Sequence, residues 1–470
     1  MMRKSILSIS IVVGLSAFAI ACTMGRLSAE PIAPDSLDVP VPEAEKPPQE
    51  LTDAAALFNK RNFRGAYEKL VEAVKKNPNL PPANIIMAQF YAQSNNPNGV
   101  RGSLERAVID TPEDPQAYLV LGDIALRERR FAEGRLLFEK AAELLESWQG
   151  SKPRKDGMMP QLYSGLAAAA EARSDWDAAQ QHLLKWLELD AKSALAMQRL
   201  AQCQFRQEKI DEALQSLQAA AKLEPEMLVP EAILAQWFAR TGDQTAAKQW
   251  LVKALTAAPR DAKARLVAAQ WAWETDQLDE AQKQADAALQ LNPGNFSALI
   301  LRGIISLFRK DYAGAEKFFE SAHLQSPQDF AASNNLAIAL IEQQDDQKRQ
   351  RALAYAENNI KQYPNASDAY STYGWVLYKL GRLQDAEAAL RKAVSGGQFS
   401  AETAFYLANV LADSGHDADA IRLVQGALQT TGPFAQRAEA KALLQQLQAS
   451  QPQQPRDSQP LPLPSETPPP

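Results

Sequence analysis

Few side chains in this 470-residue sequence could carry catalysis or bind a metal. The three histidines, His182, His323 and His416, have no Cys or His neighbour at the spacing typical of zinc ligands or of an activated nucleophile. Of the two cysteines, Cys203 could act as a lone nucleophile, and Cys22 follows an apolar segment at the N-terminus. No glycine-rich phosphate-binding loop follows a predicted strand. The sequence therefore predicts a protein that is not an enzyme and that has no cofactor or metal site.

A recurring pattern of small and large apolar residues is the main feature of the sequence. The stretch "AYSTYGWVLYKLGRLQDAEAALRKAV", residues 369–394, reads as two amphipathic helices. The small residue at Ala386 in this stretch recurs at intervals of 34 earlier in the chain, at Ala179, Ala213, Ala247, Ala281 and Ala315. Proline follows the same interval, at Pro225, Pro259, Pro293 and Pro327.

This 34-residue pattern resembles the tetratricopeptide repeat (TPR) family. The stretches "YLVLGDIAL" (118–126) and "DYAGAEKFFESAHLQSP" (311–327) match the family pattern well. The resemblance implies an all-α fold, a right-handed α-solenoid of about eleven helix-turn-helix units. The units are expected to begin at Pro47, Pro81, Pro115, Pro160, Ala194, Leu228, Ala262, Phe296, Phe330, Ser367 and Ala401.

Two surpluses interrupt the repeat spacing, eleven residues between the third and fourth units and three between the ninth and tenth. We assign both to polar loops, "SWQGSKPRKDGMMP" (147–160) and "EQQDDQKRQR" (342–351). The segment from Ser147 to Met159 is expected to be the most protease-sensitive part of the solenoid, because it holds three basic residues in a loop with Gly and Pro.

The recurring small residues are expected at close helix crossings. A larger side chain in place of Gly374 or Ala386 would push the two helix backbones of a hairpin apart, and Leu390 fills the space beside them. Cys203 is predicted to be a core residue rather than a nucleophile. Its equivalents in other repeats are apolar: Ile124, Ala169, Trp237, Trp271 and Ile305.

Composition agrees with a helical, non-nucleic-acid-binding protein. Hydrophobic residues make up 46% of the chain, and no sustained β-branched alternation predicts strands. The formal net charge is −6, from 50 basic and 56 acidic residues, and no basic stripe is present. Nucleic acid is therefore not an expected partner.

The N-terminus has the outline of a bacterial secretion signal, expected to span residues 1–21. The basic start "MMRK" precedes a 17-residue apolar run, which is short for a membrane-spanning helix. The following "AIAC" resembles the lipobox of bacterial lipoproteins, although Ala19 replaces the usual Leu. The resemblance implies that Cys22 is diacylated and anchors the protein to a membrane.

The alternative is ordinary signal cleavage after Ala21 or Ala29, which would release the protein into the periplasm. Thr23 is not the Asp that retains enteric lipoproteins at the inner membrane, so a lipidated protein is expected on the periplasmic side of the outer membrane.

The composition of the remaining chain suggests three further parts. Residues 22–46 are rich in Pro and acid and are predicted to form a tether. The solenoid is expected over 47–449, ending in a capping helix over 435–449 whose polar residues face water. Residues 450–470 are predicted to be a disordered Pro/Gln-rich tail.

The family resemblance implies that partners bind in a concave groove lined by the first helix of each repeat. One series of first-helix positions changes along the chain from polar to apolar, and with its neighbours it gives the candidate groove residues Gln202, Gln236, Gln270, Ile304, Ile338, Trp375, Tyr378, Phe405 and Asn409. We expect Ile338, Trp375, Tyr378 and Phe405 to be exposed anchors for a partner. The alternative is that neighbouring repeats bury these side chains.

These observations predict a non-enzymatic scaffold or adaptor of the bacterial cell envelope that binds other proteins or peptides. Lipoproteins of this family serve in pilus, secretion and polysaccharide-export assemblies. The alternative is a module that binds an envelope glycan or an assembly factor for polysaccharide export, because exposed aromatic residues and a Gln series could contact sugars.

Overall fold

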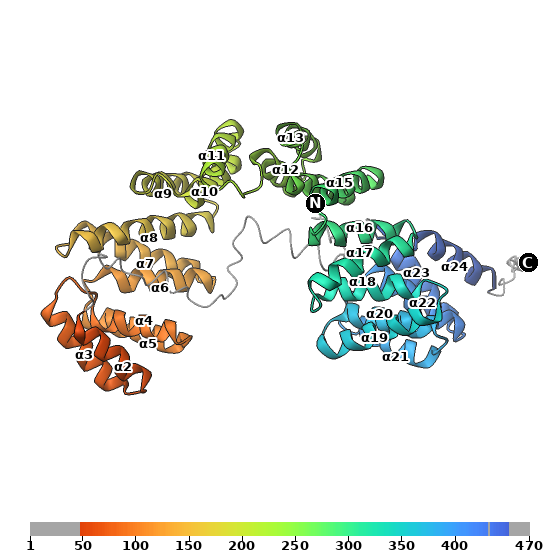
Figure 1. Ribbon diagram of the computed structural model, residues 1–470, viewed down its shortest axis with the longest axis horizontal. Coiled ribbons are helices and arrows are strands. Elements are labelled where there is room, and N and C mark those ends of the chain that lie inside the picture. The colour runs from red at the N-terminus through yellow and green to blue at the C-terminus, as the bar shows by residue number, and fades with distance from the viewer. Residues whose placement is uncertain (1–47, 431–432, 451–470) are drawn as a thin grey trace, which may run out of the picture. The chain divides into compact units, whose positions relative to one another are not determined.

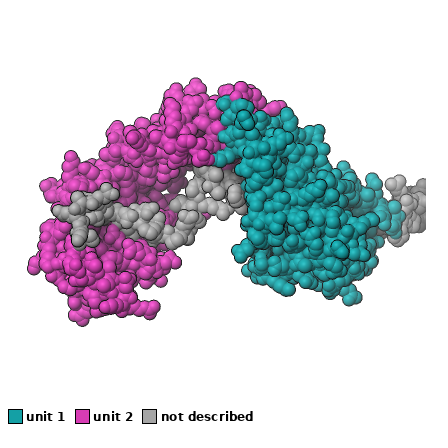
Figure 2. All heavy atoms as spheres, viewed as in Figure 1, with its two compact units in different colours: residues 1–19, 257–470 teal, residues 20–256 magenta. Residues whose placement is uncertain are grey.

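The computed structural model describes residues 48–430 and 433–450, and the regular secondary structure among these residues is α-helical (Figure 1). The expected signal peptide (1–21), the tether (22–46) with Cys22, and the tail beyond residue 450 lie outside the described residues. Two compact units contain the described chain, residues 48–256 and residues 257–450 without 431–432 (Figure 2).

In the unit of residues 48–256, consecutive helices form antiparallel hairpins. Its helices are α2 (Gln49–Asn59), α3 (Phe63–Lys76), α4 (Ala83–Gln93), α5 (Pro97–Asp110), α6 (Pro115–Arg127), α7 (Phe131–Glu146), α8 (Lys152–Glu171), α9 (Trp176–Leu189), α10 (Ala194–Arg206), α11 (Ile210–Leu223), α12 (Pro230–Thr241) and α13 (Gln244–Ala257).

The unit of residues 257–450 repeats this arrangement and ends in one additional helix, α24. Its helices are α14 (Ala262–Glu274), α15 (Leu278–Leu291), α16 (Phe296–Phe308), α17 (Tyr312–Gln325), α18 (Phe330–Ile341), α19 (Asp346–Gln362), α20 (Ser367–Lys379), α21 (Leu383–Val394), α22 (Ala401–Asp413), α23 (Asp417–Leu428) and α24 (Arg437–Ser450). The first helices of successive hairpins, α14, α16, α18, α20 and α22, contact one another in order.

The helical boundaries confirm the predicted all-α solenoid. Pairing α2 with α3 and continuing to α22 with α23 gives eleven hairpins among the described residues. The first helix of each hairpin begins within two residues of the position expected from the sequence in every hairpin except the fourth. The 34-residue spacing therefore predicts both the number of hairpins and where each one begins.

The predicted loop at residues 147–160 is wrong from Lys152 onward, because α8 begins there. Ser151 caps this helix by accepting a hydrogen bond from the Arg154 amide, and Pro153 lies in the first turn, where a missing N–H costs nothing. Arg154 is buried against Asp114, with 2.9 Å between Nη2 and Oδ2. Lys152, Arg154 and Lys155 therefore lie in a helix rather than in a loop, and the protease sensitivity of residues 147–159 stays a prediction.

The three extra residues between the ninth and tenth hairpins also lengthen a helix rather than a loop. Helix α19 has 17 residues, compared with 14 in α17, and Asp345 caps its N-terminus by accepting from the Lys348 amide. Most of the polar stretch 342–351 is therefore helical, because charged residues are good helix formers when one face is exposed.

The turn inside most hairpins places one residue in the left-handed region, again at intervals of 34. Glu208, Gly242, Asp276 and Lys310 have φ of 64°, 90°, 59° and 59°. Only glycine adopts this conformation without steric cost from a Cβ atom.

We therefore expect Glu208→Gly to raise the free energy of unfolding by about 1 kcal/mol, because it removes left-handed strain from an exposed residue. Gly242→Ala is the matched control in the next hairpin and should lower it by a similar amount, although a Cβ there would contact nothing within 4 Å. Urea unfolding of both variants measures the difference. A destabilised Glu208→Gly would show that the turn tolerates L-residues without strain.

Small residues occupy the close crossings, as the sequence predicts. A Cβ added to Gly374 would lie 2.5 Å from Leu390 Cγ and 3.1 Å from the backbone oxygen of Ala386. Such distances require the two helices to separate. The close approach explains why one position in each hairpin is Gly or Ala.

Ala247→Leu should therefore lower the free energy of unfolding by roughly 1–3 kcal/mol, through overpacking at a crossing where Ala247 is fully buried. Gln249→Leu lies on the same helix, α13, at an exposed position and should change stability by less than about 0.5 kcal/mol. Thermal unfolding measures the melting temperature of both variants, and each introduces the same leucine side chain. Equal melting temperatures would contradict the assigned repeat phase.

Candidate functional site

The glutamine series does not form one site within a compact unit. Gln202 and Gln236 lie on α10 and α12 in the unit of residues 48–256, whereas Gln270 lies on α14 in the other unit. All three side chains are partly buried.

The aromatic residues expected as exposed anchors form an internal cluster instead. Trp375 is only 5% exposed, and its ring stacks on Tyr406 with 4.2 Å between ring centroids. Its indole Nε1 donates a hydrogen bond to Glu342 Oε1 at 2.7 Å. The ring of Tyr378 also stacks on Trp375, with 5.2 Å between ring centroids. The cluster therefore joins α18, α20 and α22, and its residues serve packing between repeats.

Phe405 and Asn409 are also engaged within the protein. Phe405 is 5% exposed and contacts the ring of Phe434, which precedes α24. The Asn409 side-chain amide donates to the Phe405 carbonyl at 2.7 Å. The prediction that Trp375 and Phe405 are exposed anchors is wrong, because the adjacent first helix and the C-terminal segment cover their rings.

Helix α24 covers more than the end of the solenoid. It contacts α22 and α23, and Glu439 forms an ion pair with Lys310 in the turn between α16 and α17. Ala440 and Leu447 are buried. The expected cap over residues 435–449 therefore exists as a helix, but it reaches back to the eighth hairpin.

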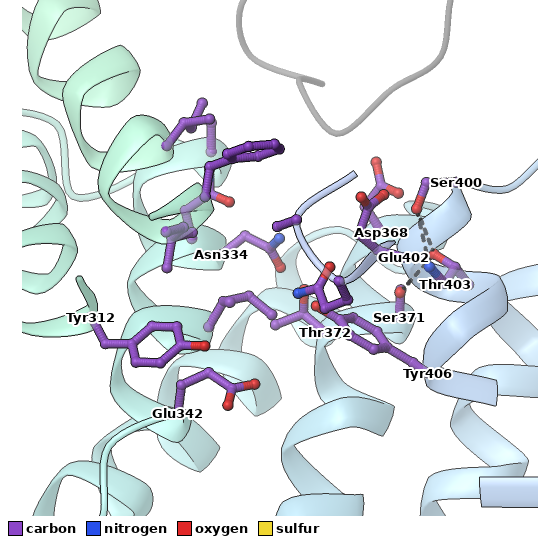
Figure 3. A pocket seen from close by; sticks show the side chains of 18 of the residues that line it. Tyr312, Asn334, Glu342, Asp368, Ser371, Thr372, Ser400, Glu402, Thr403 and Tyr406 are labelled. Atoms are coloured by element: carbon purple, nitrogen blue, oxygen red, sulfur yellow. Dashed lines mark hydrogen bonds between the residues drawn. The ribbon is translucent and has the colours of Figure 1, made fainter. Parts of the chain in front are cut away.

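A pocket of about 110 Å³ lies on the face formed by the first helices α14, α16, α18, α20 and α22 (Figure 3). Two of the predicted groove residues, Ile304 and Ile338, line it. Its apolar lining comes from Trp273, Ile304, Leu307, Phe308, Phe330, Ala331, Ile338 and Ala435. Its polar lining comes from Tyr312, Asn334, Asn335, Glu342, Asp368, Ser371, Thr372, Ser400, Glu402, Thr403, Tyr406 and Gln436.

Three carboxyl groups line the pocket, on Glu342, Asp368 and Glu402, and none of its described lining residues is basic. Glu342 is already paired, because it accepts hydrogen bonds from the Trp375 indole and from Lys379. Figure 3 shows Asp368 and Glu402 at the same side of the pocket as Ser400. The pocket is therefore electronegative on this side, and apolar side chains such as Ile304, Ile338 and Phe330 line other parts of it.

Glu402 is the most unusual of these groups. It lies in the first turn of α22 and is 7% exposed, and neither of its carboxyl oxygens has a hydrogen-bond partner of normal geometry among the described residues. Burial raises the pKa of Glu402 to about 8, and the charge of Asp368 adds to the rise. The nearby amide of Glu402, the Ser400 hydroxyl and Arg437 oppose the shift without cancelling it.

The surroundings of Glu402 supply no strong donor. The Ser400 hydroxyl caps α22 by accepting from the Thr403 amide and lies 3.1 Å from the Thr403 hydroxyl, which also bonds to Ser371. Arg437 donates to the backbone carbonyls of Leu428 and Thr430. Burial also raises the pKa of Asp368.

We expect Glu402→Gln to change how stability depends on pH. The folded pKa of about 8 lies above the ordinary value of 4.5, so the stabilising protonation is complete below about pH 4.5 and is lost as the pH rises through about 8. The free energy of unfolding of the wild type should fall relative to that of the variant between these two values. Urea unfolding at about pH 5 and about pH 8 measures this. A constant difference would mean that Glu402 titrates normally.

The residues that first suggested chemistry lie elsewhere. Cys203 is fully buried, and burial raises the pKa of its thiol to about 12, so the thiolate needed for nucleophilic attack does not form at neutral pH. His416 is exposed at the start of α23. The described residues contain no group of three or more metal-ligating side chains. Sequence reasoning missed Glu402, because a Glu in the first turn of a helix is common there and gives no signal of burial.

No helix in the described part of the chain combines the length and apolar composition needed to cross a bilayer.

Comparison with known proteins supports the repeat assignment. Residues 87–150, 266–329 and 336–401 match the tetratricopeptide repeat family. A search of curated proteins found no match.

This chain is similar to several solved structures at low sequence identity, among them a tetratricopeptide repeat protein. One, from Parabacteroides merdae, has 15% identity over 62% of this chain and 100% of its own, with a TM-score of 0.37. Yeast Tom70 has 14% identity over 85% of this chain and 95% of its own, with a TM-score of 0.33. Pseudomonas aeruginosa PilF has 19% identity over 47% of this chain and 96% of its own, with a TM-score of 0.35.

Helical hairpins at 34-residue intervals, glycine or alanine at their crossings and three matching segments agree with one another. Repeats of this type form scaffolds for protein interaction rather than catalytic domains. This chain is a tetratricopeptide repeat protein.

Proposed function

We propose that this protein is a non-enzymatic adaptor of the bacterial cell envelope that binds a peptide segment of a partner protein on the first-helix face of residues 257–450. The observation that supports this site is the pocket beside Ile304 and Ile338, which combines apolar lining residues with the buried carboxyl group of Glu402, whose oxygens lack a hydrogen-bond partner among the described residues. Concave sites with a few convergent polar groups are typical of ligand recognition.

A pocket-blocking variant tests this function. Ala331 lines the pocket, so Ala331→Trp should fill it and abolish the capture of partner proteins from solubilised cell envelopes. Leu195→Trp places the same large side chain at a residue that is 56% exposed on α10 and should leave capture unchanged. Equal capture by both folded variants would place the partner site elsewhere on the protein.

We propose further that diacylation of Cys22 anchors the adaptor on the periplasmic side of the outer membrane. The support is the basic start, the apolar run and the "AIAC" sequence before Cys22. A palmitate analogue fed to cells should label the wild type and not Cys22→Ser. Absence of label in both proteins would contradict lipidation and favour a periplasmic protein.

The glycan-binding alternative loses its main support in this structure. It depended on exposed aromatic side chains, and both Trp375 and Phe405 are buried.

A further inference from the structure

The carboxyl group of Glu402 is buried at an energetic cost that the neighbouring groups of the chain offset only in part. An unpaired buried carboxyl group loses hydration, whether or not it is ionised. In contrast, the buried Arg154 is paired, because its guanidinium group lies 2.9 and 3.2 Å from the two carboxylate oxygens of Asp114. Both residues belong to the unit of residues 48–256. Glu402 opens onto a pocket, so a group from outside the chain can reach it.

We propose that this pocket binds the cationic side chain of an arginine or lysine residue in the partner peptide, with its charged end at Glu402 and Asp368. The proposal rests on the adaptor function and names the chemistry of the partner. The apolar wall formed by Ile304, Ile338 and Phe330 suits the aliphatic stem of such a side chain. Asp368 adds a second negative group on the same side.

The lining favours an organic cation over a metal ion. Divalent calcium takes six to eight oxygen ligands, whereas only Asp368 and Glu402 are unpaired carboxyl groups here. Tyr406 and Tyr312 line the same pocket, and burial raises the pKa of Tyr312 to about 12 and that of Tyr406 well above its ordinary value. Both phenols therefore stay protonated and supply no further negative charge.

Binding of a cation should release a proton. With a pKa of about 8, Glu402 is mostly protonated at neutral pH in the free protein, and a neighbouring cation favours the ionised form. The groups that face it are Asp368 on α20, Arg437 on α24 and Ser400 before α22. Tyr406, on the same helix as Glu402, interacts electrostatically with both Glu402 and Glu342. The affinity for the cation should therefore rise as the pH increases toward 8, by up to about tenfold for each pH unit.

Calorimetric titration of the full chain with blocked pentapeptides tests the proposal. The probes are Ala-Leu-Arg-Leu-Ala, its lysine counterpart and its norleucine counterpart, which keeps the apolar stem without the charge. We expect at least one cationic peptide to bind about tenfold or more tightly than the norleucine peptide. Glu402→Gln should remove this preference and the pH dependence, and Glu402→Asp should retain part of both.

The results separate this proposal from the adaptor function. If the arginine, lysine and norleucine peptides bind equally and Ala331→Trp abolishes their binding, the pocket is a peptide site but not a cation site. If no peptide binds while envelope proteins are still captured in an Ala331-dependent manner, the proposed side-chain chemistry is wrong and the adaptor function stands. Tight binding of calcium chloride alone, lost in Glu402→Gln, would assign the pocket to a metal ion. An unchanged melting temperature of Glu402→Gln at about pH 5 shows that the variant is folded.

Discussion

Replacement of Trp375 by alanine should lower the free energy of unfolding by about 3–5 kcal/mol, the usual cost of truncating a buried tryptophan. The ring contributes stacking with Tyr406 and Tyr378, and its Nε1 hydrogen-bonds to Glu342. The substitution leaves a cavity where α18, α20 and α22 meet. Urea unfolding, followed by far-ultraviolet circular dichroism, measures the loss.

Tyr378→Phe is the matched control in the same cluster. It keeps the stacked ring and removes only the hydrogen bond that the Tyr378 hydroxyl donates to Asp413 at 2.8 Å, so it should cost about 1 kcal/mol. If Trp375→Ala instead leaves the unfolding free energy unchanged and reduces partner affinity, Trp375 is a binding anchor. That result would support the prediction from the sequence that Trp375 is an exposed anchor, which its burial in the structure contradicts.

The second large effect is expected at the buried ion pair of α6 and α8. Asp114→Asn should lower the free energy of unfolding by about 3–5 kcal/mol, because the Arg154 guanidinium would stay buried without a counter-charge. Asparagine keeps the capping bond that position 114 accepts from the Gln116 amide at 3.0 Å, so the loss of charge is isolated from the loss of the cap. Chemical denaturation of the full chain provides the measurement.

The double variant Asp114→Asn with Arg154→Met is the control. It removes both charges and keeps an unbranched apolar stem beside Trp148, whose ring lies 5.2 Å from the Arg154 guanidinium carbon. Most of the lost stability should return, because a buried pair is often replaceable by apolar residues. A double variant as unstable as Asp114→Asn would show that the geometry of the pair, rather than its charge, holds α8 in place.

The hairpins could be predicted from the sequence because their determinants are local and repeated. Ala247 and Gly374 are small for the same reason in different hairpins: two helix backbones cross there. A proline follows two residues after the ends of α11, α13, α15 and α17, at Pro225, Pro259, Pro293 and Pro327. Any position under such a constraint recurs at the same interval, and one sequence suffices to see it.

The site could not be predicted in this way because its determinants are not local. The sequence predicts that Trp375 is exposed, because several earlier hairpins have glutamine at the equivalent position. Glu342 and Tyr406 come from the two neighbouring hairpins and contact it. Glu402 is buried in a pocket that is also lined by Ala435 and Gln436, just before α24, and nothing in the repeat pattern predicts that these residues lie there. The extra residues at 152–159 are helical, and Arg154 among them pairs with Asp114, which lies 40 residues earlier in the chain.

The ion pair between Lys310 and Glu439 joins residues 129 positions apart and has a consequence for cooperativity. In a simple repeat array each hairpin interacts only with its neighbours, so the last one opens most easily and opening spreads inward. Here the C-terminal helix is tied to the eighth hairpin as well as to the eleventh. Fraying from that end must break contacts to both hairpins at once. Because both side chains are about half exposed, this ion pair contributes about 0–1 kcal/mol and couples the C-terminal helix only weakly to the eighth hairpin.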